Sequence, residues 1–88
     1  MPKLTISYDQ PTDNDLDVYY RFYEDGKLVV DNIAVTKFTY IAKEFGEHSY
    51  TMTGYDPSEN VEGEHSAPIT KVFTKPLPPT SITISWEK

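Results

Sequence analysis

The acidic residues Asp13, Asp15, Asp17 and Glu24 have the spacing closest to a metal site. Counted from Asp13, they take the first, third, fifth and twelfth positions of an EF-hand calcium loop. That loop needs a glycine at its sixth position for a sharp turn, and this chain has Val18 there. The residues that follow alternate like a strand. The sequence therefore predicts a solvated acidic loop here and no bound metal.

The two histidines, His48 and His65, lack the spacing of a catalytic or zinc-binding motif. Ser49 follows His48 directly, but adjacent residues in a strand point to opposite faces and do not form a Ser–His pair. The chain has no cysteine, so thiolate chemistry and disulfides are excluded. Carboxylate pairs fall in loops, with no apolar surroundings to raise a pKa. We expect a non-enzymatic protein with no catalytic residue and no cofactor.

Two predicted features carry residues that could bind a partner. Tyr19, Arg21 and Tyr23 alternate along one predicted strand and share its outward face. They form either a contact stripe for a protein or a sugar, or ordinary cross-strand packing. Glu62 and Glu64 belong to an acidic loop, residues 56–66. This loop either meets a basic surface or keeps the protein soluble.

The composition limits the class of protein. A chain of 88 residues has room for one domain, and 14% aromatic residues supply large side chains for a small core. A net charge of −6 with scattered cations argues against nucleic acids and anionic membranes as partners. No run is long and apolar enough for a transmembrane helix. The lack of cysteine favours folding in a reducing cytoplasm.

Apolar and polar residues alternate with a period of two along most of the chain, which predicts strands. Asp25-Gly26 suits the positive φ angles of a type I′ hairpin turn. We predict an all-β, two-sheet antiparallel sandwich of about seven strands, with a small open barrel as the alternative. The predicted strands are residues 4–8, 17–23, 28–30, 33–42, 50–55, 68–73 and 82–86.

The order of these features resembles a fibronectin type III domain, which is an immunoglobulin-like sandwich. Four segments are similar to strands B, C, E and G of that family, and a fifth resembles the turn that leads to the tyrosine of strand F. Tyr8 stands where the family usually has tryptophan, and the family's Leu-x-Pro is missing before Tyr50. The resemblance implies a fold and says little about function. The segments are Leu4–Pro11, Val18–Tyr23, Lys37–Ile41, Ser66–Ile69 and, for the turn, Phe45–Tyr50.

A repeat joins the two ends of the chain. Lys3-Leu-Thr-Ile-Ser-Tyr-Asp9 matches Ser81-Ile-Thr-Ile-Ser-Trp-Glu87 position by position, at an offset of 78. We therefore divide the chain into a sandwich body, residues 1–74, and a proline-rich arm with a C-terminal strand, residues 75–88. The end strand either returns to its own sandwich as an edge strand or completes a neighbour. A truncated tandem array is the third explanation.

These features lead to an expected function. An assembly module without disulfides and with a spare strand predicts a bacteriophage virion protein: a decoration, head-fibre or tail-associated subunit. Ile82, Ile84 and Trp86 would dock on a capsid or tail protein or on a neighbouring copy, which makes a homo-oligomer by strand addition possible. The expected location is the virion, assembled in the bacterial cytoplasm. The alternative is a ligand- or carbohydrate-binding module in the cytoplasm or at the cell surface.

Overall fold

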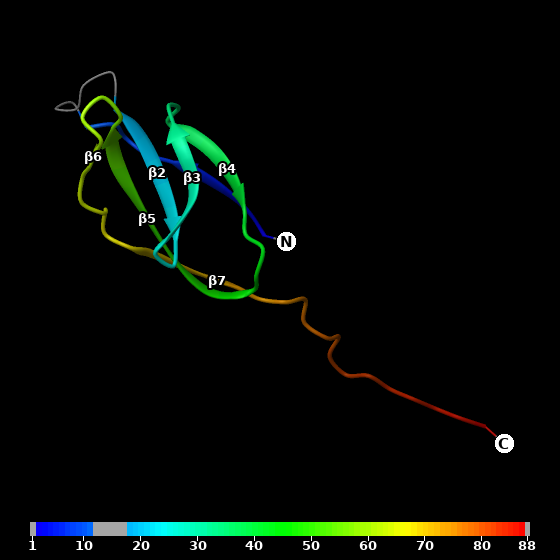
Figure 1. Ribbon diagram of the computed structural model, residues 1–88. Coiled ribbons are helices and arrows are strands. Elements are labelled where there is room, and N and C mark those ends of the chain that lie inside the picture. The colour runs from blue at the N-terminus through cyan, green and yellow to red at the C-terminus, as the bar shows by residue number, and fades with distance from the viewer. Residues whose placement is uncertain (1, 12–17, 88) are drawn as a thin grey trace.

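The computed structural model describes residues 2–11 and 18–87, and these form an all-β protein. Seven strands make two antiparallel sheets, and no helix occurs among the described residues (Figure 1). The strands are β1 (Lys3–Ser7), β2 (Tyr19–Glu24), β3 (Lys27–Ile33), β4 (Lys37–Ile41), β5 (Gly46–Asp56), β6 (Val61–Glu62) and β7 (Ile69–Phe73).

The smaller sheet contains only β1 and β4. The larger sheet has the order β3-β2-β5, and both β6 and β7 then pair with β5. β6 pairs with the end of β5 at Tyr55 and Asp56, and β7 pairs with its beginning, from Gly46 to Tyr50. The two short strands therefore share β5 as a partner and cover different parts of its length.

The hairpin between β2 and β3 confirms the turn predicted from the sequence. Asp25 and Gly26 have φ angles of 52° and 81°, and the flanking residues Glu24 and Lys27 pair directly. Two successive positive φ angles define a type I′ turn, whose twist matches that of the strands it joins.

The core lies between the two sheets and is built mainly from aromatic rings. Phe22 is its centre, with its ring centroid 5.2 Å from that of Tyr50, 5.4 Å from that of Phe38 and 5.6 Å from that of Tyr40. Alternation along β2 and β5 brings Phe22 and Tyr50 to one face of the larger sheet. The smaller sheet supplies Phe38 and Tyr40 from the other side.

Glu24 ties the two sheets together at one end of the core. Its carboxylate accepts hydrogen bonds from the hydroxyl of Tyr40 on the smaller sheet (3.1 Å) and of Tyr50 on the larger sheet (2.7 Å). Burial, with the Glu24 hydrogen bond second, raises the pKa of Tyr50 above its ordinary value. The phenol therefore stays protonated as a donor.

Three boundaries differ from the sequence prediction. The strand predicted for residues 33–42 is divided, because Ile33 ends β3 and β4 begins only at Lys37. The acidic loop contains the short strand β6, and β5 starts earlier than predicted, at Gly46. β6 and the start of β5 were not predicted because they contain glycine and acidic residues, which have low strand propensity. Only pairing with a neighbouring strand makes these residues strands.

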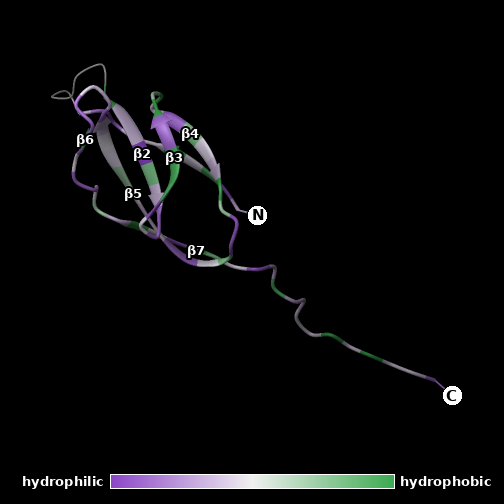
Figure 2. Ribbon diagram, viewed as in Figure 1, coloured by the Kyte–Doolittle hydropathy of each residue, from purple (hydrophilic) through white to green (hydrophobic). Residues whose placement is uncertain are grey.

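The segment predicted as the seventh strand, residues 82–86, has no strand partner in the described chain. Residues 74–87 instead leave the body as an extended arm, with apolar positions recurring along it (Figures 1 and 2). The molecule measures 78 × 20 × 17 Å, with a radius of gyration of 19.6 Å. A compact chain of this length has a radius of gyration of about 12 Å. Within the described residues no helix is long and apolar enough to cross a membrane.

Candidate functional site

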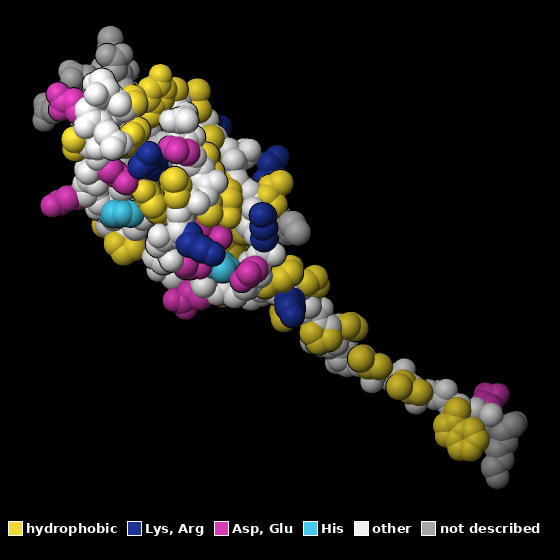
Figure 3. Space-filling model, viewed as in Figure 1, with side chains coloured by type: hydrophobic (Ala, Val, Ile, Leu, Met, Phe, Trp, Pro, Cys, Tyr) yellow, Lys and Arg dark blue, Asp and Glu magenta, His cyan; other side chains and the backbone are white. Residues whose placement is uncertain are grey.

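The C-terminal arm exposes large apolar side chains. Ile82, Ile84 and Trp86 are 69%, 87% and 78% exposed. Figure 3 shows hydrophobic side chains along the whole arm, away from the body. These three residues alternate, so a strand formed by residues 81–87 would bring all of them to one face. The arm thus has the alternating apolar residues of a strand but no strand partner among the described residues.

Prolines hold this arm away from the body. Pro76, Pro78 and Pro79 each fix φ near −65° and lack a backbone N–H, which favours an extended, unpaired segment. All described residues from Thr74 onward are exposed. Residues 74–87 therefore form an exposed segment that follows β7 and joins no strand.

Glu62 organises a polar cluster on the outer face of the larger sheet. Its carboxylate accepts hydrogen bonds from Thr53 Oγ1 (2.5 Å) and Arg21 Nη1 (3.1 Å), and a further one from the hydroxyl of Tyr23. The Thr53 and Tyr23 hydrogen bonds, followed by the charge of Arg21, lower the pKa of Glu62. The carboxylate is stabilised in its charged form where β2, β5 and β6 meet.

Aromatic rings extend this outer-face cluster in both directions. The Arg21 guanidinium lies 3.7 Å from the centroid of the Tyr55 ring and forms an ion pair with Asp31 at 3.0 Å. The Tyr23 ring contacts His65, with 4.6 Å between ring centroids. Two of the three side chains of the predicted stripe, Arg21 and Tyr23, therefore contact other side chains of the same chain.

The predicted binding residues outside the arm divide into two groups. Arg21, Tyr23 and Glu62 come together in the outer-face cluster, although the sequence separates Glu62 from the other two. Tyr19 and Glu64 are exposed. The sequence prediction missed Thr53, whose signal was its place in the alternation of β5.

His48 forms a second polar contact that the sequence did not indicate. Its Nδ1 lies 2.6 Å from a carboxylate oxygen of Asp25, and its Nε2 lies 3.2 Å from the backbone carbonyl of Glu44. The hydrogen bond with Asp25 raises the pKa of His48, and the same bond lowers the pKa of Asp25. The side chain is 9% exposed.

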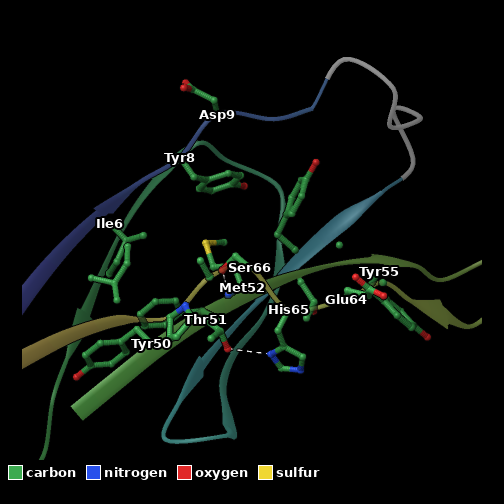
Figure 4. A pocket seen from close by; sticks show the side chains of 18 of the residues that line it. Ile6, Tyr8, Asp9, Tyr50, Thr51, Met52, Tyr55, Glu64, His65 and Ser66 are labelled. Carbon is green, nitrogen blue, oxygen red and sulfur yellow. Dashed lines mark hydrogen bonds between the residues drawn. The ribbon is translucent and has the colours of Figure 1, made fainter. Parts of the chain in front are cut away.

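A groove of about 1030 Å³ runs along β1 on the open side of the sandwich. Residues 4–9 form one wall and residues 63–69 the other, and Tyr20, Phe22 and Met52 of the core lie between them. Figure 4 shows Ile6, Tyr8 and Met52 turned toward this groove, and His65 on the other side of β5. The groove therefore gives access to core side chains. We call it the β1 groove.

No protein-family model, curated protein or solved structure matches this chain. The chain offers three surfaces for contact with another molecule: the exposed arm, the β1 groove and the outer-face cluster.

Residues 2–11 and 18–87 contain no group of three or more His, Cys, Asp or Glu side chains placed to hold a metal ion. The acidic residues Asp13, Asp15 and Asp17 of the calcium-like motif lie outside the described residues. The outer-face cluster pairs its charges internally, and the arm and the groove offer apolar contact.

Proposed function

We propose that this protein is a non-enzymatic assembly module: an immunoglobulin-like sandwich whose C-terminal arm docks on a protein partner. The partner is a capsid or tail protein or a neighbouring copy, and the setting is a bacteriophage virion, as a decoration, head-fibre or tail-associated subunit. The contact is made by Ile82, Ile84 and Trp86.

The exposure of these three alternating residues is the observation that carries the proposal. Burying an apolar side chain of this size contributes about 1.5–3 kcal/mol. An unpaired strand with an apolar face is also prone to aggregate, and proteins normally cover such a strand. Pairing with a partner both buries the side chains and satisfies the backbone of the strand.

The strand pairing supports an immunoglobulin-like body. In the resemblance to fibronectin type III domains, β1, β2, β4, β5 and β7 correspond to strands B, C, E, F and G. The pairs β1–β4, β2–β5 and β5–β7 are then B–E, C–F and F–G, which are neighbours in such sandwiches. The strand that would precede β1 at the edge of the smaller sheet is lacking among the described residues.

The virion setting rests on the resemblance and on the absence of cysteine, and it stays a prediction. Carbohydrate binding through Tyr19 and Tyr23 stays a prediction as well, and a glycan array with both residues changed to alanine tests it. Because Tyr23 is bonded to Glu62 and packed on His65, Tyr19 is the more open of the two rings.

Deleting residues 76–88 tests the docking role. We expect a folded body with an unchanged far-ultraviolet circular dichroism spectrum that no longer associates. Association is measured by light scattering for copies of the chain and by co-sedimentation for particles that carry it. If the deletion unfolds the body and leaves the oligomeric state unchanged, the arm completes its own sandwich and the proposal is wrong.

A further inference from the structure

We propose that the β1 groove is the acceptor for the arm, and that its occupant is residues 81–87 of a second copy of this chain, added antiparallel to β1. The inference rests on the proposed docking role of the arm and names the partner. Four observations carry it: a free backbone edge, a matching apolar face, the charges at the strand ends and the area left exposed.

The edge of β1 that borders the groove has no strand partner among the described residues. In the pairing with β4, Tyr8 N–H donates to Thr36 O, and Ala42 N–H donates to Pro2 O. Since hydrogen-bonded pairs alternate in an antiparallel ladder, the even-numbered residues of β1 bond to β4. Lys3, Thr5 and Ser7 therefore direct their N–H and C=O groups toward the groove. β1 has β4 as its one strand partner in the described chain.

The apolar face of the arm matches the inward face of β1. Leu4, Ile6 and Tyr8 point inward and are partly buried against the core. Residues 82, 84 and 86 have the same alternation. A strand placed beside β1 would continue this apolar row and cover the core side chains that line the groove.

Charge selects the direction of the added strand. In an antiparallel arrangement with Ile84 opposite Ile6, Glu87 stands opposite Lys3. A parallel arrangement in the register of the internal repeat would place Glu87 beside Asp9 instead. Opposite charges facing across two strands stabilise the pair, and like charges destabilise it. The antiparallel direction is therefore favoured.

This direction also points to a second copy. β7 ends at Phe73, which pairs with Gly46, near the end of the sandwich where Pro2 bonds to Ala42 and β1 begins (Figure 1). To run antiparallel to β1, the same chain would first have to cross the whole length of the groove. Residues 74–80 would have to span this length and also reverse direction, and three of these seven residues are prolines. An arm from another molecule has no such constraint.

The exposed area is sufficient for such an interface. The accessible surface of the chain is 7183 Å². A compact protein of 10.1 kDa has about 5,300 Å². The excess of about 1,900 Å² falls within the range of about 1,200–2,000 Å² that a specific, stable interface buries.

Trp86 is the only tryptophan and reports directly on docking. We expect the full chain to scatter light as two or more copies, with Trp86 emission at short wavelength that shifts to long wavelength on dilution. Thr5→Pro removes an N–H that faces the groove and keeps the ladder with β4. This variant is expected to be monomeric, with Trp86 emission at long wavelength at every concentration.

Thr39→Pro is the matched control. Thr39 pairs with Thr5 across the small sheet and directs its N–H to the opposite, outer edge of β4. We expect this variant to associate like the unchanged chain. Equal circular dichroism spectra for the two proline variants show that both are folded. If T5P keeps the light-scattering mass and the Trp86 emission of the unchanged chain, the β1 groove is not the acceptor.

Ile84→Asp separates this inference from the proposed function. Loss of association in I84D together with normal association in T5P supports the docking arm and overturns the groove as its site. Normal association in both variants overturns both ideas. An unchanged chain that is monomeric, with exposed Trp86, overturns the groove as the acceptor, because no second copy is bound.

Cysteine pairs test the register, because the natural chain contains no cysteine. Mixing Thr5→Cys with Ser85→Cys is expected to give a disulfide-linked dimer, since directly opposite residues have Cα atoms about 5 Å apart. Thr39→Cys mixed with Ser85→Cys is expected to stay unlinked. Efficient linkage of Thr5→Cys with Thr83→Cys in place of Ser85→Cys would contradict the proposed register.

Discussion

Glu62 and Glu64 lie two positions apart and have different surroundings. Glu62 accepts hydrogen bonds from Thr53, Tyr23 and Arg21, whereas Glu64 is exposed. The pairing of Glu62 with residues of β2 and β5 holds β6 against the larger sheet. At the scale of single residues, the acidic loop is therefore partly a structural element.

Glu62→Ala is expected to destabilise the protein by about 1–2 kcal/mol, because it removes three charge-assisted hydrogen bonds at a partly exposed site. Glu64→Ala, at the exposed position, is the matched control and is expected to change the free energy of unfolding by less than about 0.5 kcal/mol. Urea denaturation at neutral pH measures both. Equal effects of the two substitutions would contradict the structural role of Glu62.

His48 and Asp25 make the stability depend on pH. The folded state raises the pKa of His48 above 6.5, so its contribution is complete below pH 6.5 and is lost as the pH rises through the folded-state pKa. The pKa of Asp25 is lowered below 3.8, so its contribution is present above pH 3.8 and is lost as the pH falls through its folded-state value. The pair contributes most between these limits.

His48→Gln is therefore expected to reduce the stability at pH 5.5 more than at pH 8.5, as measured by the thermal unfolding midpoint at the two pH values. His65→Gln leaves the His48–Asp25 pair in place and is expected to keep the difference between the two midpoints. A difference that is unchanged in H48Q and absent in H65Q would contradict this assignment.

At the scale of elements, the β2–β3 hairpin depends on the backbone conformation of its turn. Its turn needs positive φ at both central residues, and Gly26 adopts 81° without strain. Nothing in the described structure lies within 4 Å of the position that a Cβ atom would occupy on Gly26. A substitution there therefore tests the backbone conformation and not side-chain crowding.

Gly26→Ala is expected to destabilise the protein by about 1–2 kcal/mol, the cost of placing a Cβ in the left-handed region. Gly63→Ala is the control, since a Cβ there meets only the Gly54 carbonyl oxygen at an ordinary 3.7 Å and no positive φ is required. Chemical denaturation of both variants measures the difference. A neutral G26A would show that the turn is not type I′ in solution.

At the scale of the whole molecule, the sandwich body and the arm are energetically separate. Every described residue of the arm is exposed, and the core cluster contains no residue beyond Phe73. The body therefore carries the folding free energy, and the arm carries apolar surface available for a partner.

Removal of residues 76–88 is accordingly expected to change the free energy of unfolding of the monomeric body by less than about 0.5 kcal/mol. The measurement uses dilute protein, in which association does not add to the stability of the unshortened chain. A loss of several kcal/mol would mean that the arm packs on its own body.

The sequence alone was enough to predict most of the strands and the Asp25-Gly26 turn. These features are local: a period of two and a dipeptide suited to positive φ act within a few residues. The short strand β6 and the early start of β5 could not be predicted this way, because only pairing with a neighbour makes those residues strands.

Only the tertiary structure decided which side chains meet. It brought Glu62 to Arg21 and Tyr23, and His48 to Asp25, across sequence separations from 23 to 41 residues. The sequence left open whether residues 82–86 return to their own sandwich, and the structure leaves them exposed and away from the sheets, while β1 pairs only with β4 among the described strands. The physical reason is that alternation specifies an apolar face, while the surface that buries this face depends on how distant segments are arranged in space.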